Sequence, residues 1–454
     1  MELNLNKLFE DYKNNHITDS MFIESLSTIV DTSKDVQLRK RILRFLGRSG
    51  LDEGKIFNYL ERILVSDSEE ILRNLAADII KSKFLKRSYK PMRFTLEHEC
   101  SPICLETIHE TLVKYIQNLP EDEMSKKDTE AFLFKEVQEI EEKDFKIGFE
   151  NILSTQNEQS LSIRSLKEIM VNYFTYVYLK KVFWRIKIKI KHCKIIELDF
   201  LFKSIKEIPD QIKLLKDLKY LILRYNKLEK IPKWIGSLDS LVVLNINVNS
   251  LVQLPESISK LKSLQKLSLW KNRLTNLPES LGELNSLEEL NLRLNYLKAL
   301  PDSLGKLKNL SELNLHDNKL DHIPESIGYC SRLKDLNLSW NYLTHLPDTL
   351  GSLINLEVLD LGKNKLKYIP KTLMHLKSLR RINLSENYIS RLPKEISSLS
   401  SLEYLNLSRN KLSSIPKEIL ELESLKELYI GDNEFNHSNG IFEKLTKRGV
   451  HVYN

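Results

Sequence analysis

The segment SLEELNLRLNYLKALPDSLGKLK, residues 286–308, indicates the architecture, because the chain repeats its pattern every 23 residues without an insertion. Ten of the 13 prolines fall at this interval. An internal repeat of this length predicts a solenoid, in which each unit buries its apolar face against its neighbours. Asparagine recurs in the same way, as Asn226, Asn249, Asn272, Asn295, Asn318, Asn341, Asn364, Asn387, Asn410 and Asn433.

Each part of the repeat has a physical role. Leu290 and Leu292 alternate with outward residues, which predicts one short parallel strand per repeat. Asn295 follows at the turn, where its amide can satisfy buried backbone groups, so the ten asparagines are expected to form an internal polar spine. Pro301 ends the extended segment, and the leucines that follow it three residues apart predict a helical turn packed back on the core.

The LxxLxLxxN…LP units between Leu218 and Asn433 resemble leucine-rich-repeat proteins of the 23-residue type found in the Ras-group intracellular family. A degenerate unit with Ile195 and Leu198 in place, but Lys203 at the asparagine position, precedes them and brings the total to about 11 repeats. The resemblance implies an α/β leucine-rich-repeat solenoid with a curved parallel sheet. It also implies a protein partner, with small GTPases and their effectors as partners known in the family.

The N-terminal third carries a different repeat. DVQLRKRILRFLGRSG and SEEILRNLAADIIKSK align Leu38 with Leu72 at a spacing of 34 residues, which resembles HEAT-type helical repeats. An ordinary small helical bundle is the alternative for this all-α region, residues 1–118.

Four further segments complete the domain organisation. Residues 119–160 are acidic and predict a charged surface helix, with a solvated linker as the alternative. Residues 161–194 predict a helix followed by a basic edge strand, which together cap the N-terminal end of the repeats. Residues 195–433 are the repeats, and 434–454 predict a C-terminal cap in which a short helix precedes a last strand.

Composition excludes several classes of protein. With 41% hydrophobic and 29% charged residues and a net charge of +7, the chain is neither disordered nor collagenous. Its longest charge-free apolar stretch, residues 169–179, is about half of a bilayer span, so no membrane span is expected. Four scattered cysteines and the absence of a readable secretory signal predict a cytoplasmic protein, and the polar terminal caps predict a monomer.

Catalytic and ligand-binding motifs are weak. Gly54-Lys55 approaches a phosphate loop, but Ile56 stands where a magnesium-binding Ser or Thr is needed. His98, Cys100 and Cys104 lack a second ligand pair at zinc-finger spacing. The sequence therefore predicts no catalytic residue, no cofactor and no metal site, and it favours a non-enzymatic interaction scaffold.

The repeat register indicates which side chains the concave face displays. Aromatic residues and arginine are the types that anchor interfaces, and mixed charges nearby, such as Glu312, Asp335 and Arg381, favour a protein partner over a nucleic acid. The alternative is that each Trp merely lies on its neighbours' aliphatic stems. The predicted binding residues are Tyr220, Arg224, Trp270, Arg293, His316, Trp340 and Tyr404.

The basic tract 180–194 offers a second hypothesis for function. It holds seven Lys or Arg and no acid, with Lys187, Lys189 and Lys191 alternating with isoleucines as on one face of a strand. Such a tract could bind an anionic surface, either lipid or nucleic acid.

Overall fold

The computed structural model describes residues 2–121, 125–155, 161–435 and 440–454, and the chain divides into two compact units. The helical unit comprises Met1–Ile186 and Ile190–Ile195. The repeat unit comprises Lys187–Lys189 and Ile196–Asn454. The predicted fold class, a leucine-rich-repeat solenoid preceded by an all-helical region, is confirmed.

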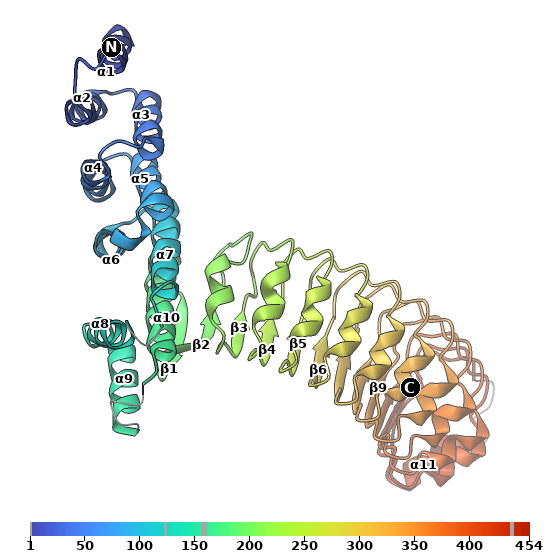
Figure 1. The fold of residues 1–454 in the computed structure, drawn as a ribbon. Helices are drawn as coiled ribbons and strands as arrows, with labels where there is room; N and C mark the ends of the chain where they lie inside the picture. Colours follow the sequence, from blue (N-terminus) through green and yellow to red (C-terminus); the bar gives the residue numbers. More distant parts are fainter. Residues whose placement is uncertain (1, 122–124, 156–160, 436–439) are drawn as a thin grey trace. The chain divides into compact units, whose positions relative to one another are not determined.

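The helical unit is built from stacked helices in two layers. In Figure 1, α2, α4 and α6 lie in one layer and α3, α5, α7 and α10 in the other. The helices are α1 (Glu2–Lys13), α2 (Asp19–Thr32), α3 (Val36–Arg48), α4 (Glu53–Ser66), α5 (Glu70–Lys83), α6 (Tyr89–His98), α7 (Pro102–Gln117), α8 (Lys126–Gln138), α9 (Lys143–Thr155) and α10 (Ile163–Val182).

Aspartate side chains cap the N-termini of two of these helices. The side chain of Asp35 accepts hydrogen bonds from the first backbone N–H groups of α3, and Asp52 does the same for Gly54 and Lys55 of α4. The Gly54-Lys55 pair is therefore the capped first turn of a helix rather than a phosphate-binding loop.

Two part-buried ion pairs lie along the helical unit, and their arginines are separated by the 34-residue interval of its sequence. Arg39 pairs with Asp67, and Arg73 pairs with Glu99 at 2.7 Å. Burial acts to raise the pKa of Glu99, but the Arg73 guanidinium and the backbone N–H groups of Ser101 and Cys100 outweigh it and lower the pKa to about 2. Corresponding residues of successive helix pairs thus tie one pair to the next.

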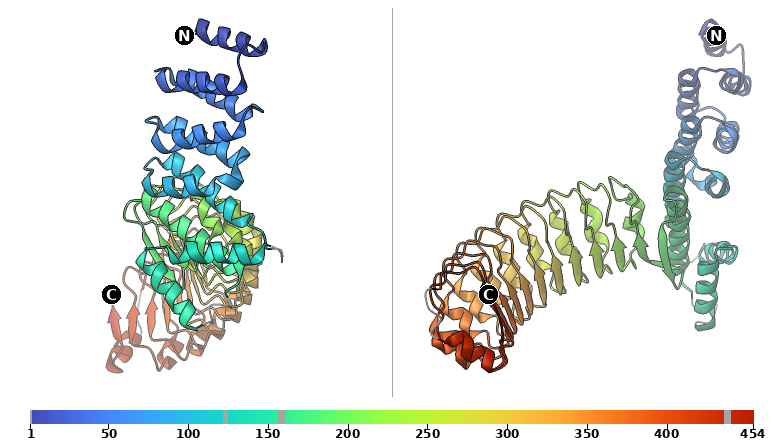
Figure 2. Two further views of the ribbon diagram at one scale, coloured as in Figure 1. Left: turned by 60° about the vertical axis from the view of Figure 1, so that its left-hand side comes forward. Right: turned by 180° about the vertical axis from the view of Figure 1, so that it is seen from behind.

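The repeat unit is one sheet of 13 strands that pair in sequence order, parallel from β2 onward. Figure 2 shows the strands side by side, with the return turns forming a separate layer. The strands are β1 (Lys187–Lys191), β2 (Lys194–Asp199), β3 (Tyr220–Ile222), β4 (Val243–Asn245), β5 (Lys266–Ser268), β6 (Glu289–Asn291), β7 (Glu312–Asn314), β8 (Asp335–Asn337), β9 (Val358–Asp360), β10 (Arg381–Asn383), β11 (Tyr404–Asn406), β12 (Glu427–Tyr429) and β13 (His451–Tyr453).

Leucine rows hold the repeats together. Leu290 of β6 is in register with Leu313 of β7 and Leu336 of β8, and all three are buried. Each return segment contains a five-residue 3₁₀ turn, such as η7 (Asp302–Lys306), which buries Leu304. A row of this kind buries apolar surface only when repeats are stacked, so the stack is stable where a single repeat is not.

The ten asparagines lie in one internal row and bond successive repeats. The Nδ2 of Asn318 donates to the carbonyls of Leu292 at 3.0 Å and Leu315 at 3.1 Å, and its Oδ1 accepts from the N–H of Leu297 at 3.1 Å. The equivalent bonds run from Asn226 to Asn433. We call this row the asparagine spine.

The residue before each spine asparagine has a left-handed backbone. Val248 has φ of 55° and Trp340 has φ of 57°, and the same conformation recurs through all ten repeats. Residues other than glycine adopt this region at a cost, and a β-branched residue does so at a larger one. The turn that places each spine asparagine is therefore locally strained.

The C-terminal end is closed by a cap. Helix α11 (Ile441–Lys447) packs its buried Leu445 against the last repeat, and Gly449, with φ of 93°, ends it. The guanidinium of Arg448 donates to the carbonyl of Leu422 at 2.6 Å, which ties the cap to the last return turn.

Candidate protein-binding site

The concave face consists of the strand positions that alternate with the leucine rows, together with the residues that follow each strand. Its first regular feature is a second column of Asn and Asp side chains at the ends of the strands, from which Ile222, Ser268 and Tyr429 depart. The Oδ1 of Asn314 accepts from the N–H of His316 at 3.1 Å, and that of Asn337 accepts from Ser339 at 3.0 Å. These hydrogen bonds end the strand and fix the backbone of the residue two positions further along, whose side chain lies on the concave face. The same bond, from the backbone N–H two residues further along to the side-chain Oδ1, recurs at Asn245, Asn291, Asp360, Asn383 and Asn406.

The sequence reasoning missed this second column, although Asn or Asp at a 23-residue interval was its signal. Ser268 interrupts the column because a serine side chain is too short to replace the amide. Asn247 of the preceding repeat takes over and accepts from the Ser268 hydroxyl and the Trp270 N–H, both at 2.8 Å. Trp270 is thereby held by the neighbouring repeat.

Three of the predicted residues, Trp270, Arg293 and His316, follow the strands of three successive repeats. The Arg293 guanidinium is 6.0 Å from the centre of the Trp270 ring, and His316 Nδ1 is 2.8 Å from the Ser339 hydroxyl. Burial and the charge of Arg293 lower the pKa of His316, which favours a neutral imidazole. A fourth predicted residue, Trp340, joins this group, with its ring centre 6.0 Å from that of His316.

A hollow opens beside Trp340 because the column of Trp270, Arg293 and His316 continues with small residues. Ser339, Gly362 and Ser385 occupy the next three repeats, and they line the hollow together with Trp340, His316 and other neighbours. The Trp340 side chain is 48% exposed, and Lys363 Nζ lies 3.3 Å from its ring centre. An exposed indole that borders an open hollow is of the kind that anchors protein interfaces.

The remaining predicted residues lie elsewhere on the concave face. Tyr220 is on β3, and Arg224 follows the same strand. Tyr404 is on β11, where its ring centre is 4.3 Å from the Arg381 guanidinium and 5.3 Å from the centre of the Tyr429 ring. The seven predicted residues thus divide into a central group and two flanks.

The cluster around Tyr404 continues beyond what the sequence analysis identified. Tyr429 stacks on Tyr453 with ring centres 4.3 Å apart, and its hydroxyl donates to Glu427 at 3.0 Å. The signal was available in the sequence, because Tyr429 replaces the asparagine of the second amide column.

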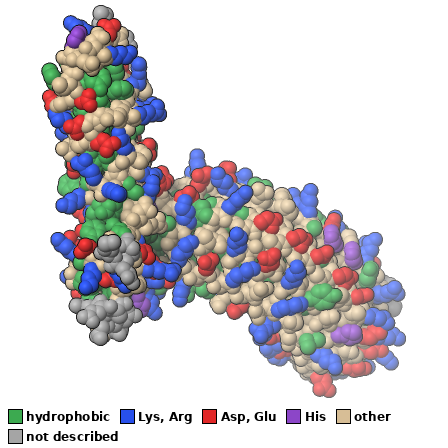
Figure 3. Space-filling model, viewed as in Figure 1, with side chains coloured by type: hydrophobic (Ala, Val, Ile, Leu, Met, Phe, Trp, Pro, Cys, Tyr) green, Lys and Arg blue, Asp and Glu red, His purple; other side chains and the backbone are tan. Residues whose placement is uncertain are grey.

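An acidic row crosses the centre of the face. Glu289, Glu312 and Asp335 are in register on β6, β7 and β8, and Lys266 pairs with Glu289 at one end. Partial burial raises the pKa of Asp335, and the negative charge of Glu312 adds to the effect. Figure 3 shows Lys, Arg, Asp and Glu side chains intermingled over the visible face of the repeat unit. A surface of mixed charge suits a protein partner better than a polyanion.

Among the described residues, two features are absent: clusters that could bind a metal ion and helices that could span a membrane. Across those ranges, no group of three or more His, Cys, Asp or Glu side chains is placed to hold a metal ion. Among the helices that the structure describes, none has both the length and the apolar character that a bilayer crossing requires.

The leucine rows, the asparagine spine and the parallel sheet define the class of leucine-rich-repeat solenoids. The chain belongs to the leucine-rich-repeat proteins: the family described as leucine-rich repeat region matches residues 188–326, and the family described as leucine rich repeat matches 331–389 and 378–435. Neither description is that of an enzyme family. A comparison with curated proteins finds no match.

Several solved structures are similar to the repeats. A leucine-rich-repeat protein of Leptospira interrogans is 28% identical over 55% of this chain and 82% of its own, with a TM-score of 0.34. The ectodomain of a plant membrane receptor kinase from Arabidopsis thaliana, solved with CASPARIAN STRIP INTEGRITY FACTOR 2, is 28% identical over 57% of this chain and 38% of its own, with a TM-score of 0.48. An internalin of Listeria monocytogenes is 18% identical over 69% of this chain and 90% of its own, with a TM-score of 0.47.

Proposed function

We propose that this protein is a non-enzymatic scaffold that binds a protein partner on the concave face of its repeat unit. The observation that carries the proposal is the hollow beside Trp340, where a half-exposed indole adjoins space vacated by Ser339, Gly362 and Ser385. Leucine-rich-repeat domains are generally interaction modules, and the face has no catalytic constellation among its described residues.

The partner's segment would place an apolar or aromatic side chain on Trp340. Arg293 and Lys363 contribute positive charge to the lining of the hollow, and Asp360 and Glu386 contribute negative charge. Such a lining favours a segment that carries both signs of charge. Trp270 and His316 extend the central contact, while Tyr220, Arg224 and Tyr404 would contact the partner only if its footprint spans most of the sheet.

Resemblance to the Ras-group family gives the finer proposal. It places the protein in cytoplasmic signalling as a monomer, with a small GTPase or a GTPase effector as the partner. The helical unit would then be a second, HEAT-like array, supported by the ion pairs of Arg39 and Arg73 at the 34-residue interval. In this proposal residues 1–118 form the HEAT-like repeats, 119–160 an acidic charged helix or linker, 161–194 the N-terminal cap of the solenoid, 195–433 the leucine-rich repeats and 434–454 the C-terminal cap.

One pair of variants tests the concave hollow. Ser385→Trp fills the hollow, whereas Ser408→Trp adds the same side chain one repeat further along, outside its lining. Both serines donate to the asparagine two residues earlier, at 2.8 Å and 2.7 Å, so both substitutions lose the same bond. The immobilised protein first captures partners from a lysate, mass spectrometry identifies them, and the purified partner is then titrated against each variant. We expect Ser385→Trp to abolish binding and Ser408→Trp to retain it.

A second candidate function has one observation in its favour. Lys187, Lys189 and Lys191 are all exposed along β1, as a surface that contacts anions would require. If the basic tract 180–194 binds an anionic surface, retention on heparin should fall when these three residues become Glu. Unchanged retention would exclude this function for the tract.

A further inference from the structure

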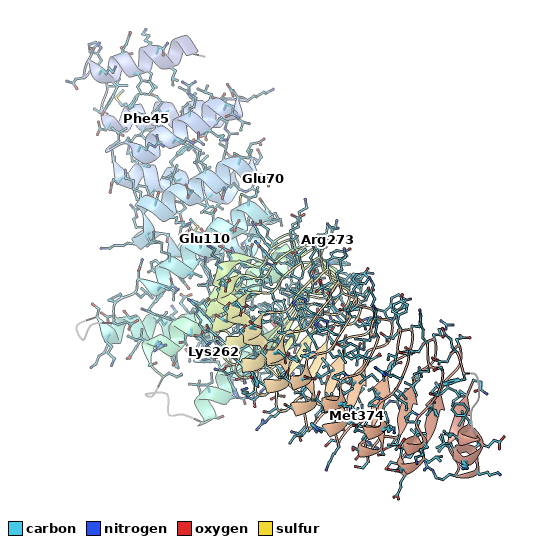
Figure 4. All side chains as sticks on the ribbon, turned by 90° about the vertical axis from the view of Figure 1, so that its right-hand side faces the viewer. Phe45, Glu70, Glu110, Lys262, Arg273 and Met374 are labelled. Carbon is cyan, nitrogen blue, oxygen red and sulfur yellow. The ribbon has the colours of Figure 1, made fainter. Side chains whose placement is uncertain are left out.

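One edge of the repeat unit carries a regular alternation that neither proposed function uses. We call it the rim: the residues that directly follow the spine asparagines. Over seven successive repeats the rim alternates a cation with a tyrosine and includes no acid. In order, these residues are Arg273 (labelled in Figure 4), Tyr296, Lys319, Tyr342, Lys365, Tyr388 and Lys411.

Backbone hydrogen bonds hold the rim in register. The N–H of Tyr296 donates to the carbonyl of Leu274 at 2.9 Å, and the N–H of Lys319 donates to that of Leu297 at 2.9 Å; the later members repeat this bond. Neighbouring rim residues therefore stand about one strand spacing apart, roughly 4.8 Å, and successive tyrosines about 10 Å apart. The rim is a rigid linear array rather than a set of independent surface residues.

The tyrosines and lysines are in contact, yet the rings stay accessible. Each lysine lies over the tyrosine of the preceding repeat: Lys319 Nζ is 4.7 Å from the Tyr296 ring centre, and Lys365 Nζ is 4.8 Å from that of Tyr342. Lys411 and Tyr388 repeat the contact at 5.4 Å. The three tyrosine residues remain 47%, 48% and 48% exposed beside these lysines, so ring surface stays accessible to a ligand.

The charge of the rim is not neutralised. Within the described ranges, no carboxylate forms an ion pair with Lys319, Lys365, Lys411 or Arg273. Other exposed aromatic residues adjoin the rim, namely Trp340 one position before the spine and Tyr368 on the outer side. The return turns differ in charge, because five successive turns begin with an acid at Glu256, Glu279, Asp302, Glu325 and Asp348.

We propose that the rim binds single-stranded nucleic acid. Phosphates would lie on the row of cations, and unpaired bases would stack on the exposed tyrosine rings between them, because proteins that bind single strands combine these two elements. A duplex keeps its bases stacked internally and could use only the cations. An acidic peptide would likewise leave the tyrosines without a planar partner. The mixed charges of the concave face disfavour nucleic acid there, whereas the seven rim residues include four cations and no acid.

The test is fluorescence anisotropy of the full chain with a labelled oligothymidylate of about 30 nucleotides. Replacing Tyr296 and Tyr342 by Ala should weaken binding about 30-fold or more, because each stacked base contributes about 1–3 kcal/mol, whereas replacing both by Phe should retain it. Four cations on the strand should give a log-log salt dependence with a slope of about −3.

A charge-matched pair of variants completes the test. Lys319, Lys365 and Lys411 replaced together by Glu should abolish binding. The same change at Lys371, Lys394 and Lys417, which open three return turns, should not. Circular dichroism melts must show that both triple variants fold.

Three results would overturn the proposal. The first is equal affinity for a duplex of the same length or for polyglutamate, which would indicate a general polyanion or acidic-protein surface. The second is full retention of binding by the Ala variant or by the rim triple variant. The third is loss of binding in the β1 variant of Lys187, Lys189 and Lys191 alone, which would locate the binding in the basic tract instead.

Discussion

The asparagine spine allows a stability prediction that can be worked out atom by atom at Asn318, which is 5% exposed. Replacing it by Ala removes three donated bonds, of which the one to the carbonyl of His316 is long at 3.5 Å, and one accepted bond. The carbonyls lose little, because Leu292 keeps the bond from Asn295 at 2.9 Å and Leu315 keeps the bond from Asn341 at 3.0 Å. The backbone N–H of Leu297 loses its acceptor inside the core. One orphaned buried donor costs about 1–3 kcal/mol, so we expect Asn318→Ala to lower the free energy of unfolding by about 2 kcal/mol.

Asn318→Asp separates the roles of the two amide atoms. It keeps an acceptor for the Leu297 N–H but turns a carboxylate oxygen toward the carbonyls of Leu292 and Leu315. At pH 7 it should therefore destabilise the protein more than Ala does. The burial and the facing carbonyls raise the pKa of such a carboxyl, so the difference should shrink as the pH falls and the protonated acid becomes a donor.

Urea unfolding followed by circular dichroism measures both variants against Asn276→Ala. The Asn276 side chain is exposed and accepts from the Thr275 hydroxyl at 3.4 Å, so its removal should change stability by less than about 0.5 kcal/mol. Equal losses for Asn318→Ala and Asn276→Ala would refute the account of the spine.

Three further changes are expected to alter stability. Val248→Asn should raise the free energy of unfolding by about 1 kcal/mol in urea denaturation, because Asn tolerates the left-handed conformation better than a β-branched residue; a loss would contradict the strain at this turn. Burial lowers the pKa of His109 from 6.5 to about 3, so the unfolded chain takes up a proton that the fold does not, and stability should fall by about 2 kcal/mol from pH 7 to pH 5. Melting curves of His109→Gln should lack this part of the pH dependence. Glu99→Gln should cost about 2–3 kcal/mol at pH 7, and pH titration of unfolding should show the difference disappearing as the pH falls from 4.5 toward 2, where Glu99 is itself protonated.

The fold was predictable from the sequence because its signal is repeated in every unit. Leu290, Leu292 and Asn295 occupy equivalent positions in each repeat, so an error in one unit would be visible in the others. The 34-residue spacing of Leu38 and Leu72 indicated the helical region but not its ion pairs, which join residues that the pattern does not place together.

The candidate site was predictable only in part. Large residues such as Trp340 stand out in a sequence, whereas the hollow beside it depends on small ones, Gly362 and Ser385, whose effect is to leave space. The strand pattern also predicts that Asn314 points to solvent and can be replaced without effect. In the structure its side chain accepts from the His316 N–H at 3.1 Å, so we expect the loss of this bond to disturb the site instead.

The bonds of the asparagine spine all point one way along the chain. Each asparagine reaches back to the preceding repeat, 21 residues earlier to an N–H and 26 residues earlier to a carbonyl. A repeat is therefore completed only by the one that follows it. On the ribosome the N-terminal repeats emerge first, and each repeat would complete its hydrogen bonds only when the next one has emerged. Folding of the solenoid would therefore follow synthesis with a delay of one repeat. The C-terminal cap then takes the place of the successor that the last repeat lacks, because β13 pairs with β12 and the carbonyl of Tyr453 accepts from the N–H of Ile430 at 2.8 Å.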